Sequence, residues 1–252
     1  MNAIRWSFAT HELFVVGGLA AAYAIGVRDE PVPRWRLACF AGGLAMVLAA
    51  VVTPLDSLAT TSLLSAHLLQ NVVFAEWAPA LVVLGVPAGL AARLGRRRIV
   101  RALTHPAVAL PLWLGTYAAW HLPAAYDTAL RHQSSLLHLE HATYFVTGVL
   151  FWWPVLQDVP HLLSAGRRGA YVFAAFMLAS PLGIVLSLLS EPAYEFYADA
   201  PAIWGLSDLA DQQIAGVTMS VEQAVVFFAV AAFFVLREFR EEESREESSQ
   251  FA

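Results

Sequence analysis

Histidines recur beside apolar stretches of this sequence, at spacings that would gather several imidazoles around one cation. His67 and Asn71 are four residues apart and therefore share a helix face, about 40° apart around the axis. His138 and His141 are three residues apart on another helix. His121 lies at the end of a separate apolar run. Imidazoles contributed by several helices can form a metal site in a bundle. The alternative is that each histidine is an ordinary hydrogen-bonding residue at a membrane edge.

The position of His138 and His141 within their helix also suits a metal. Both occupy its expected first turns, where the positive end of the helix dipole disfavours imidazolium and leaves a neutral nitrogen to coordinate. Glu140, which lies between them, is expected to point to a different side of the helix.

The last apolar run opens with further polar side chains. Asp211 and Glu222 lie within about 20° of one stripe along that helix, since eleven residues make nearly three turns. Met219 lies off the stripe but near enough to the same end to offer a thioether to a soft ion such as Cu(I), although methionine is also a common core filler. The candidate metal ligands are thus His67, His121, His138 and His141, with Asn71, Asp211, Gln212 and Met219 as neighbouring polar or soft groups.

Two acidic residues fall near the middle of apolar runs. Glu76 and Glu222 would each cost roughly 2.5–3.5 kcal/mol at bilayer depth, so an acid in such a position is a functional candidate. Glu76 is nine residues from His67 and is expected on the opposite helix face, outside the histidine group. Either a protonated glutamic acid bonds a neighbouring helix, or Glu76 and Glu222 share a proton or cation path.

The elements that must position these residues are helices in a membrane. Hydrophobic residues make up 58% of the chain and charged residues 14%, and about 20 mainly apolar residues are needed to cross the hydrocarbon core. Seven apolar runs approach that length once their flanks are included. They are Leu13–Val27, Leu37–Val52, Ala66–Leu90, Pro106–Leu122, Leu136–Leu156, Ala170–Leu189 and Gln213–Leu236.

The charged residues between the runs predict their orientation. All fifteen basic side chains are arginine, and thirteen lie in alternate gaps or after the last run, whereas only Arg5 and Arg131 lie on the other side. Cytoplasmic loops retain basic residues. The sequence therefore predicts an all-α polytopic membrane protein of seven transmembrane helices, with its N-terminus outside, its C-terminus cytoplasmic and its histidine group on the outer face.

The two ends of the chain carry separate expectations. Leu13–Val27 could be a cleaved signal sequence, but only Arg5 precedes it and Arg28 and further arginines follow, which favours a retained helix. We expect residues 1–240 to form the membrane domain and residues 241–252 a charged, disordered cytoplasmic tail. The single cysteine, Cys39, excludes an intramolecular disulfide and a CxxC motif.

Seven strings of the sequence resemble one family in order and spacing. They are TPLDSLA (Thr53–Ala59), HLLQN (His67–Asn71), LVVLGVP (Leu81–Pro87), WHLPAAY (Trp120–Tyr126), HLEH (His138–His141), FWWPVL (Phe151–Leu156) and LSDLADQQIAG (Leu206–Gly216). Together they cover most of the chain. Their pattern is similar to that of the CtaG family, seven-helix assembly factors for haem–copper cytochrome c oxidases.

This resemblance implies a non-enzymatic assembly factor in the bacterial plasma membrane that holds or delivers copper at its outer face. The metal-site positions that the resemblance implicates are His67, His121, His138, His141 and Asp211, with Gln212 beside them. Its partners would be cytochrome c oxidase subunits and the lipid bilayer, with no nucleic acid. Glycine pairs such as Gly17–Gly18 and Gly42–Gly43 would permit a homo-oligomer. The chain departs from the family at Asn71, where a second histidine is expected, and at Glu76 and Glu222, where apolar residues are expected.

Three other functions compete with this hypothesis. A cation or proton transporter would use Glu76 and Glu222 as a relay. A membrane haem protein would use imidazoles from two helices as axial ligands, although the histidines crowd one edge. A metal-dependent hydrolase would need a histidine and an acid at the membrane face, but the sequence contains neither an HExxH string nor a nucleophile elbow.

Overall fold

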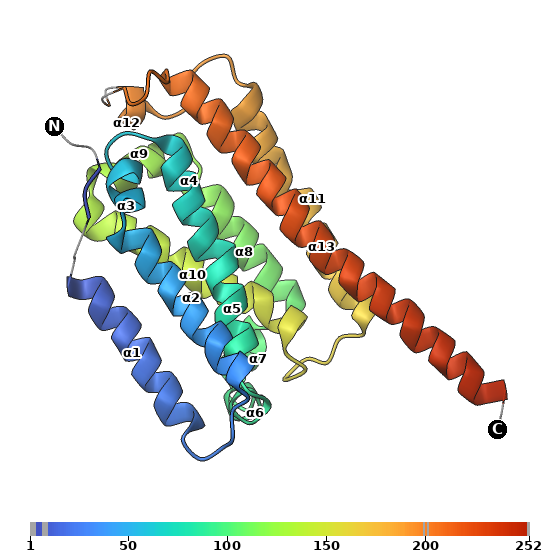
Figure 1. Ribbon diagram of the computed structural model, residues 1–252. Helices are drawn as coiled ribbons and strands as arrows, with labels where there is room; N and C mark the ends of the chain where they lie inside the picture. The colour runs from blue at the N-terminus through green and yellow to red at the C-terminus, as the bar shows by residue number, and fades with distance from the viewer. Residues whose placement is uncertain (1–3, 7–9, 199, 201, 251–252) are drawn as a thin grey trace.

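Each of the seven apolar runs forms the greater part of a helix in the computed structural model, which describes residues 4–6, 10–198, 200 and 202–250 (Figure 1). The third run is one continuous helical rod of three labelled parts. The long helices are α1 (Thr10–Val27), α2 (Arg34–Val52), α4 (Leu64–Val72) continued by the π-helix η1 (Val73–Trp77) and α5 (Ala78–Gly85), α8 (Pro106–Trp120), α10 (His138–Leu156), α11 (Ala165–Leu188) and α13 (Asp208–Gln250).

Four of these helical rods are long and apolar enough to cross a membrane. They are α2, the rod Leu64–Gly85, α11, and α13 over Asp208–Ser248. The apolar part of α1 is shorter, α8 has 15 residues, and α10 carries His138, Glu140 and His141 in its first turn. The prediction of an apolar all-helical membrane protein is confirmed to this extent, and the count of seven spans and their orientation stay predictions.

Short helices lie at the two ends of the bundle. They are α3 (Pro54–Ala59), α9 (Pro123–Arg131), η2 (Gln133–Leu137) and α12 (Glu195–Ala198) at one end, and α6 (Ala88–Gly95) and α7 (Arg98–Leu103) at the other. We call the first the histidine end, since His67, His121 and His141 lie there, and the second the arginine end, since α6 and α7 carry an arginine group.

The π-helical turn follows from a proline. Pro79 has no N–H, so it cannot donate to the Ala75 carbonyl four residues earlier, and the N–H of Ala78 bonds the carbonyl of Val73, five residues back. The indole N–H of Trp113 bonds the free Ala75 carbonyl at 3.2 Å. A change of helical pitch therefore lies in the middle of the bundle, and Glu76 lies within it.

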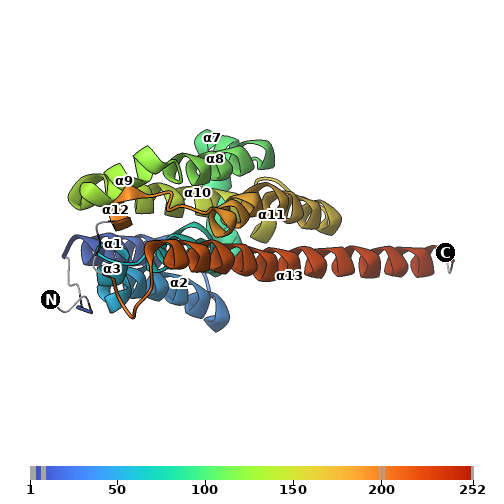
Figure 2. The ribbon, with the colours of Figure 1, turned by 90° about the horizontal axis from the view of Figure 1, so that it is seen from above.

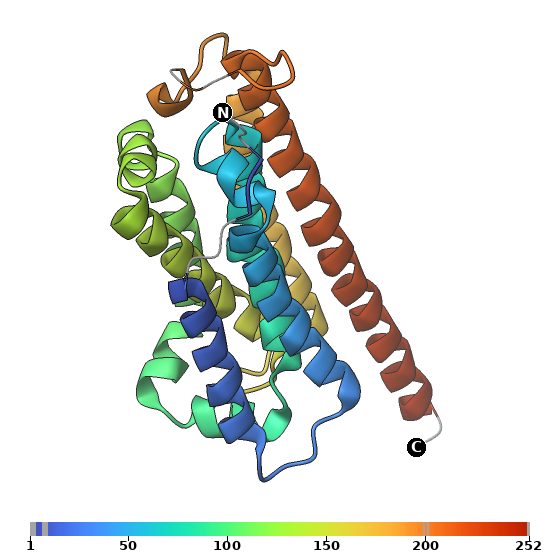
Figure 3. The same cartoon turned by 60° about the vertical axis from the view of Figure 1, so that its left-hand side comes forward.

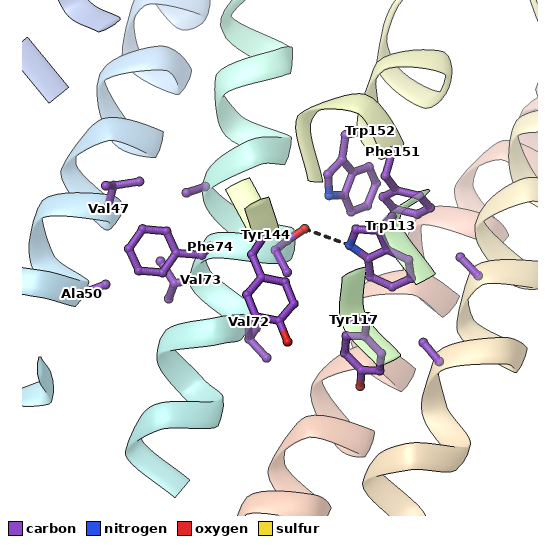
Figure 4. Packing of buried hydrophobic residues seen from close by; sticks show 14 of the residues in the cluster. Val47, Ala50, Val72, Val73, Phe74, Trp113, Tyr117, Tyr144, Phe151 and Trp152 are labelled. Carbon is purple, nitrogen blue, oxygen red and sulfur yellow. Dashed lines mark hydrogen bonds between the residues drawn. The ribbon is translucent and has the colours of Figure 1, made fainter. Parts of the chain in front are cut away.

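Close packing surrounds this turn. A side chain at Gly148 of α10 would collide with the Ala75 carbonyl and Pro79, so glycine lets the two helices approach. Trp113 packs beside Phe151 (Figure 4). Their ring centroids are 4.7 Å apart. These buried rings form the centre of the hydrophobic core.

The last two long helices form a hairpin in which α11 and α13 run side by side (Figures 1 and 2). Gly183 and Gly216 allow this approach, because a Cβ on either would meet the backbone of the opposite helix. The C-terminal part of α13 extends beyond α11 (Figure 2). A disordered tail was expected from residue 241, whereas α13 continues to Gln250 and includes an Arg237–Glu241 ion pair of 2.7 Å at helical spacing.

The first hairpin packs α1 against α2 at the edge of the bundle (Figure 3). Tyr23 stacks on Phe40 at 3.8 Å and donates to the Gly85 carbonyl at 2.9 Å. Gly17 and Gly18 face open space, whereas Gly43 is in tight contact with Val82 and the Ala78 carbonyl within the chain. The Gly43 contact therefore serves the fold, and a homo-oligomer stays a prediction.

Candidate metal site at the histidine end

His67 of α4 is fully buried and held through one ring nitrogen. The Tyr197 hydroxyl donates to the Ala59 carbonyl at 2.6 Å, so the His67 Nδ1–H must donate to the Tyr197 oxygen at 3.2 Å. In the neutral ring the Nε2 lone pair is then free. It faces Glu140 Oε1 at 3.5 Å and has no hydrogen-bond partner. A lone pair beside a carboxylate is a suitable place for a proton or another cation.

Glu140 belongs to this group, and the prediction that it points elsewhere is wrong. The side chain is fully buried, and its Oε1 accepts a hydrogen bond of 2.9 Å from Asn71 Nδ2. Its Oε2 has no partner. The buried arc of α10 includes Glu140, His141 and Tyr144, whereas His138 is half-buried. Residue spacing gives relative angles around a helix, but it does not say which arc faces the neighbouring helices.

His121 follows the last residue of α8, where the Leu122–Pro123 step ends the helix. Its Nδ1–H donates to the Tyr117 carbonyl at 2.8 Å, and the Tyr144 hydroxyl lies 3.2 Å from the same nitrogen. The Nε2 atom is buried without a partner. His121 therefore repeats the state of His67, with one nitrogen anchored and the other free.

His141 completes the group from α10. Its ring stacks on Phe74 at 4.4 Å and lies edge-on to His67, with centroids 6.2 Å apart. Its buried Nε2 has no partner. His138 lies one turn earlier and near enough to interact electrostatically with His141. We call His67, His121, Glu140 and His141 the histidine cluster.

Tyrosines enclose the cluster, and none of them was predicted to belong to the site. The Tyr126 ring lies 4.9 Å from His67 and stacks on Tyr194 at 4.1 Å. Burial raises the pKa of the Tyr197 phenol well above its usual range, with the Glu140 carboxylate adding to the shift, and burial likewise raises the pKa of Tyr194. Both phenols stay neutral. Tyr126 belongs to the string WHLPAAY, whereas Tyr194 and Tyr197 lie in the segment between α11 and α13, Tyr197 within α12.

The chemistry of these donors fits a cation, although the arrangement is not a preformed metal centre. Within the histidine cluster, four buried atoms lack hydrogen-bond partners: His67 Nε2, His121 Nε2, His141 Nε2 and Glu140 Oε2. Buried polar groups are normally satisfied, so such atoms point to a missing partner. Within the described part of the chain, however, no three His, Cys, Asp or Glu side chains are arranged to hold one metal ion. Coordination would require the rings to move together.

Asp211 and Gln212 have structural partners at this end. Asp211 accepts hydrogen bonds from the Leu64 N–H at 2.6 Å and from the N–H and hydroxyl of Ser65. The Asp211 carboxylate, on α13, therefore caps the start of α4. Gln212 accepts from the Ala193 N–H at 2.6 Å. Both residues therefore fasten α13 to neighbouring segments.

Glu76 and Glu222 lie deeper in the bundle. Glu76 Oε1 accepts from Gln223 Nε2 at 3.0 Å, and the same amide group donates to the Tyr117 hydroxyl at 3.2 Å. Glu222 accepts a hydrogen bond from the Trp77 indole and is near enough to interact with Glu76. Glu76 is not part of the histidine cluster, although Glu76, Asn71 and His121 lie around one small cavity. The π-helical turn changes the rotational position of Glu76 relative to an ideal α-helix.

The fold and site define a class of membrane-associated helical bundle with buried donors near one end. The chain belongs to the family described as cytochrome c oxidase caa3 assembly factor, which matches residues 16–241. This result confirms the CtaG resemblance, and the family's description is that of an assembly factor for cytochrome c oxidase.

Relatives with curated sequences are longer proteins. The chain is 24% identical to the uncharacterized protein Mb0105 of Mycobacterium bovis and to the uncharacterized protein MT0111 of Mycobacterium tuberculosis; each alignment covers 87% of this chain and 36% of the relative. It is 23% identical to the uncharacterized protein ML1998 of Mycobacterium leprae, over 79% of this chain and 34% of that protein. The chain thus spans about a third of the length of these relatives. No solved structure matches it.

Proposed function

We infer that this chain assists the assembly of a haem–copper cytochrome c oxidase by holding copper, as cargo, in the histidine cluster. The observation that carries this function is the set of three imidazole nitrogens and one carboxylate oxygen, all buried and all without a hydrogen-bond partner. Unsatisfied buried polar atoms cost about 1–3 kcal/mol each. A bound cation would offset that cost.

The tautomers of the anchored histidines support this proposal. His67 and His121 each donate their Nδ1–H to a protein oxygen, which leaves Nε2 unprotonated in the neutral ring. Metal-binding histidines usually have their second nitrogen fixed in this way, because the hydrogen bond orients the ring and makes the other nitrogen more basic.

The charge of the cluster favours a monovalent cation. Glu140 is buried, and an ionised carboxylate in a dry site needs a compensating charge. Imidazole is a good ligand for copper, and Cu(I) with one carboxylate would be neutral overall. Asn71 holds Glu140 at 2.9 Å, so this residue, which stands where a family histidine is expected, would orient a ligand rather than bind the metal.

The orientation follows from the arginine distribution. The arginine end would face the cytoplasm, and the histidine end would open to the outer side of the bacterial plasma membrane. The loop that carries Tyr194 and Tyr197 covers the cluster from that side. An oxidase subunit approaching there would reach the copper through this loop.

Cu(I) loading of the detergent-purified protein tests the proposal. The His67→Ala/His141→Ala variant should lose copper that the wild type retains. The matched control is His132→Ala, because His132 is exposed at the same end and its Nδ1 lies at hydrogen-bond distance from the Thr128 carbonyl rather than in the cluster. Equal copper in all three proteins, or none in the wild type, would contradict the proposal. In cells, the double variant should lower oxidase copper content at unchanged abundance of this protein.

Proton or cation transport is a second candidate. It is supported by the buried chain from Glu222 and Glu76 through Gln223 to Tyr117. Transport predicts that Glu76→Gln abolishes flux in proteoliposomes while copper binding at the histidine cluster persists. Unchanged flux in Glu76→Gln would remove this candidate.

A further inference from the structure

An open groove lies at the arginine end of the bundle, where α7 meets the start of α8 and the segment 157–164 that leads into α11. Its volume is about 440 Å³, within the size range of small-molecule sites. The residues that line it are Arg98, Arg101, Ala102, His105, Val108 and His161. The groove is therefore separate from the histidine cluster, which lies at the opposite end of the molecule (Figure 1).

Local contacts hold the walls of the groove in place. The His161 Nε2–H donates to the Arg101 carbonyl at 2.8 Å, which ties the segment 157–164 to α7. The rings of His105 and His161 lie edge to face, with centroids 4.9 Å apart. His105 also caps α8, because its Nδ1 accepts a hydrogen bond from the Ala107 N–H at 3.2 Å. The groove is thus formed by the fold before anything binds in it.

The surface inside the groove is almost wholly apolar, although four of its six lining residues are arginine or histidine. Arg98 and Arg101 therefore contribute mainly the carbon atoms of their side chains to it. Long basic side chains commonly lay the aliphatic stem along apolar surface and keep the charged head in water. An apolar groove with cationic heads at its margin suits an amphiphile better than a free ion.

The arginines beside the groove carry charge that no acidic side chain among the described residues neutralises. The neighbouring acids have other partners, since Glu30 pairs with Arg93 at 3.3 Å and Asp158 pairs with Arg168. Four exposed arginines form no ion pair within the described part of the chain: Arg96, Arg97, Arg98 and Arg101. A cluster of this kind attracts an anionic partner.

Exposed apolar side chains accompany these charges. Ile99 of α7 is 67% exposed, and Leu162, next to His161, is 75% exposed. Basic and apolar side chains on one short segment are typical of a chain that lies in the headgroup region of a bilayer. In that region a phosphate and an acyl chain belong to the same molecule, and anionic lipids attract clustered basic residues. The charge and the apolar groove therefore favour the same occupant, a membrane lipid.

We propose that this groove binds one anionic phospholipid. An acyl chain lies in the apolar groove past Ala102 and Val108, and the guanidinium groups of Arg98 and Arg101 bind the phosphate at its margin. Guanidinium pairs with phosphate through two parallel charge-assisted hydrogen bonds. A headgroup with net negative charge is preferred over a zwitterionic one, because the four unpaired arginines have no other counter-charge. The site goes beyond the proposed copper function, since no residue of the histidine cluster takes part.

Native mass spectrometry of the detergent-purified protein tests this site, with added phosphatidylglycerol or with phosphatidylcholine of the same acyl chains. The wild type should retain phosphatidylglycerol in preference. Arg98→Gln/Arg101→Gln should bind it more weakly by roughly tenfold or more. The matched control is Arg34→Gln/Arg167→Gln, which removes the same charge from two exposed arginines at the same end but outside the groove, and it should bind as the wild type does.

A second pair of variants tests the acyl chain without changing charge. Ala102→Phe fills the groove and should also weaken phosphatidylglycerol binding, whereas Ala170→Phe, at an exposed position of α11 outside the groove, should not. Equal loss in both double arginine variants would assign the binding to general charge and overturn the site. Unchanged binding in Ala102→Phe, displacement of the lipid by inorganic phosphate, or equal retention of the two lipids would overturn it as well.

Discussion

Arg168 at the arginine end and three imidazoles at the histidine end are all buried, but their polar atoms have opposite surroundings. At the arginine end, Arg168 is 7% exposed, and each part of its guanidinium has a partner. It donates to the carbonyls of Leu163 at 3.2 Å and Val155 at 3.0 Å, and it pairs with Asp158. At the histidine end, the free nitrogen of each of three buried imidazoles has no hydrogen-bond partner.

This difference distinguishes buried groups that stabilise the fold from buried groups that are available to bind a ligand. Arg168 joins the end of α10 to the start of α11, so its interactions define where the chain turns. The histidine cluster costs folding free energy as it stands, because its orphaned atoms lose hydration without gaining a partner. Unsatisfied buried groups of this kind call for an explanation, and a bound ion is one such explanation. The comparison predicts that substitutions at the two ends have different consequences.

The largest effect is expected at the arginine end. Arg168→Ala should lower the free energy of unfolding by about 3 kcal/mol, because it leaves buried carbonyls without a charged donor. Arg167→Ala, one residue away and exposed, should change it little. Chemical unfolding in detergent measures both. If the Arg168→Ala protein is as stable as the Arg167→Ala protein, the hydrogen bonds and ion pair of Arg168 do not stabilise the fold.

A smaller effect is expected from Asp211, which lies at the histidine end but has structural partners. Asp211→Ala should destabilise the protein by about 1–2 kcal/mol, as loss of a helix cap does, because the Leu64 N–H and Ser65 lose their acceptor. Copper stoichiometry should be unchanged. Loss of copper at unchanged stability would make Asp211 a ligand and contradict this assignment.

The smallest effect on stability is expected within the cluster itself. His141→Phe should change the free energy of unfolding in the absence of metal by less than about 1 kcal/mol, or raise it, because the new ring can stack on Phe74 and removes an orphaned nitrogen. The same unfolding assay checks this. A loss comparable to that of Arg168→Ala would mean that His141 stabilises the fold.

The helices were largely predictable from the sequence, because long apolar runs and prolines act locally. Pro106 begins α8, and the Leu122–Pro123 step ends it near His121, as expected. The grouping of His67, His121 and His141 at one end also followed from the order of the runs. That end's assignment to the outer side of a membrane stays a prediction.

The composition of the site was harder to predict, because it depends on tertiary contacts. Glu140 was excluded on angular spacing, yet α10 buries the arc that contains it. Glu76 stays outside the histidine cluster, but the π-helical turn in which it lies, next to Pro79, does not follow from residue spacing on an ideal helix. Tyr197 reaches His67 across 130 residues of sequence, a contact that no local pattern contains.

Thermal unfolding with and without Cu(I) tests most directly the claim that the histidine end is a cation site. A ligand that binds only the folded state stabilises it by about 2.7 kcal/mol at a hundredfold excess over its Kd. The account predicts that Cu(I) raises the Tm of the wild type and of His132→Ala, and has a much smaller effect on His67→Ala/His141→Ala. An equal rise in all three proteins, or no rise in the wild type, would contradict it.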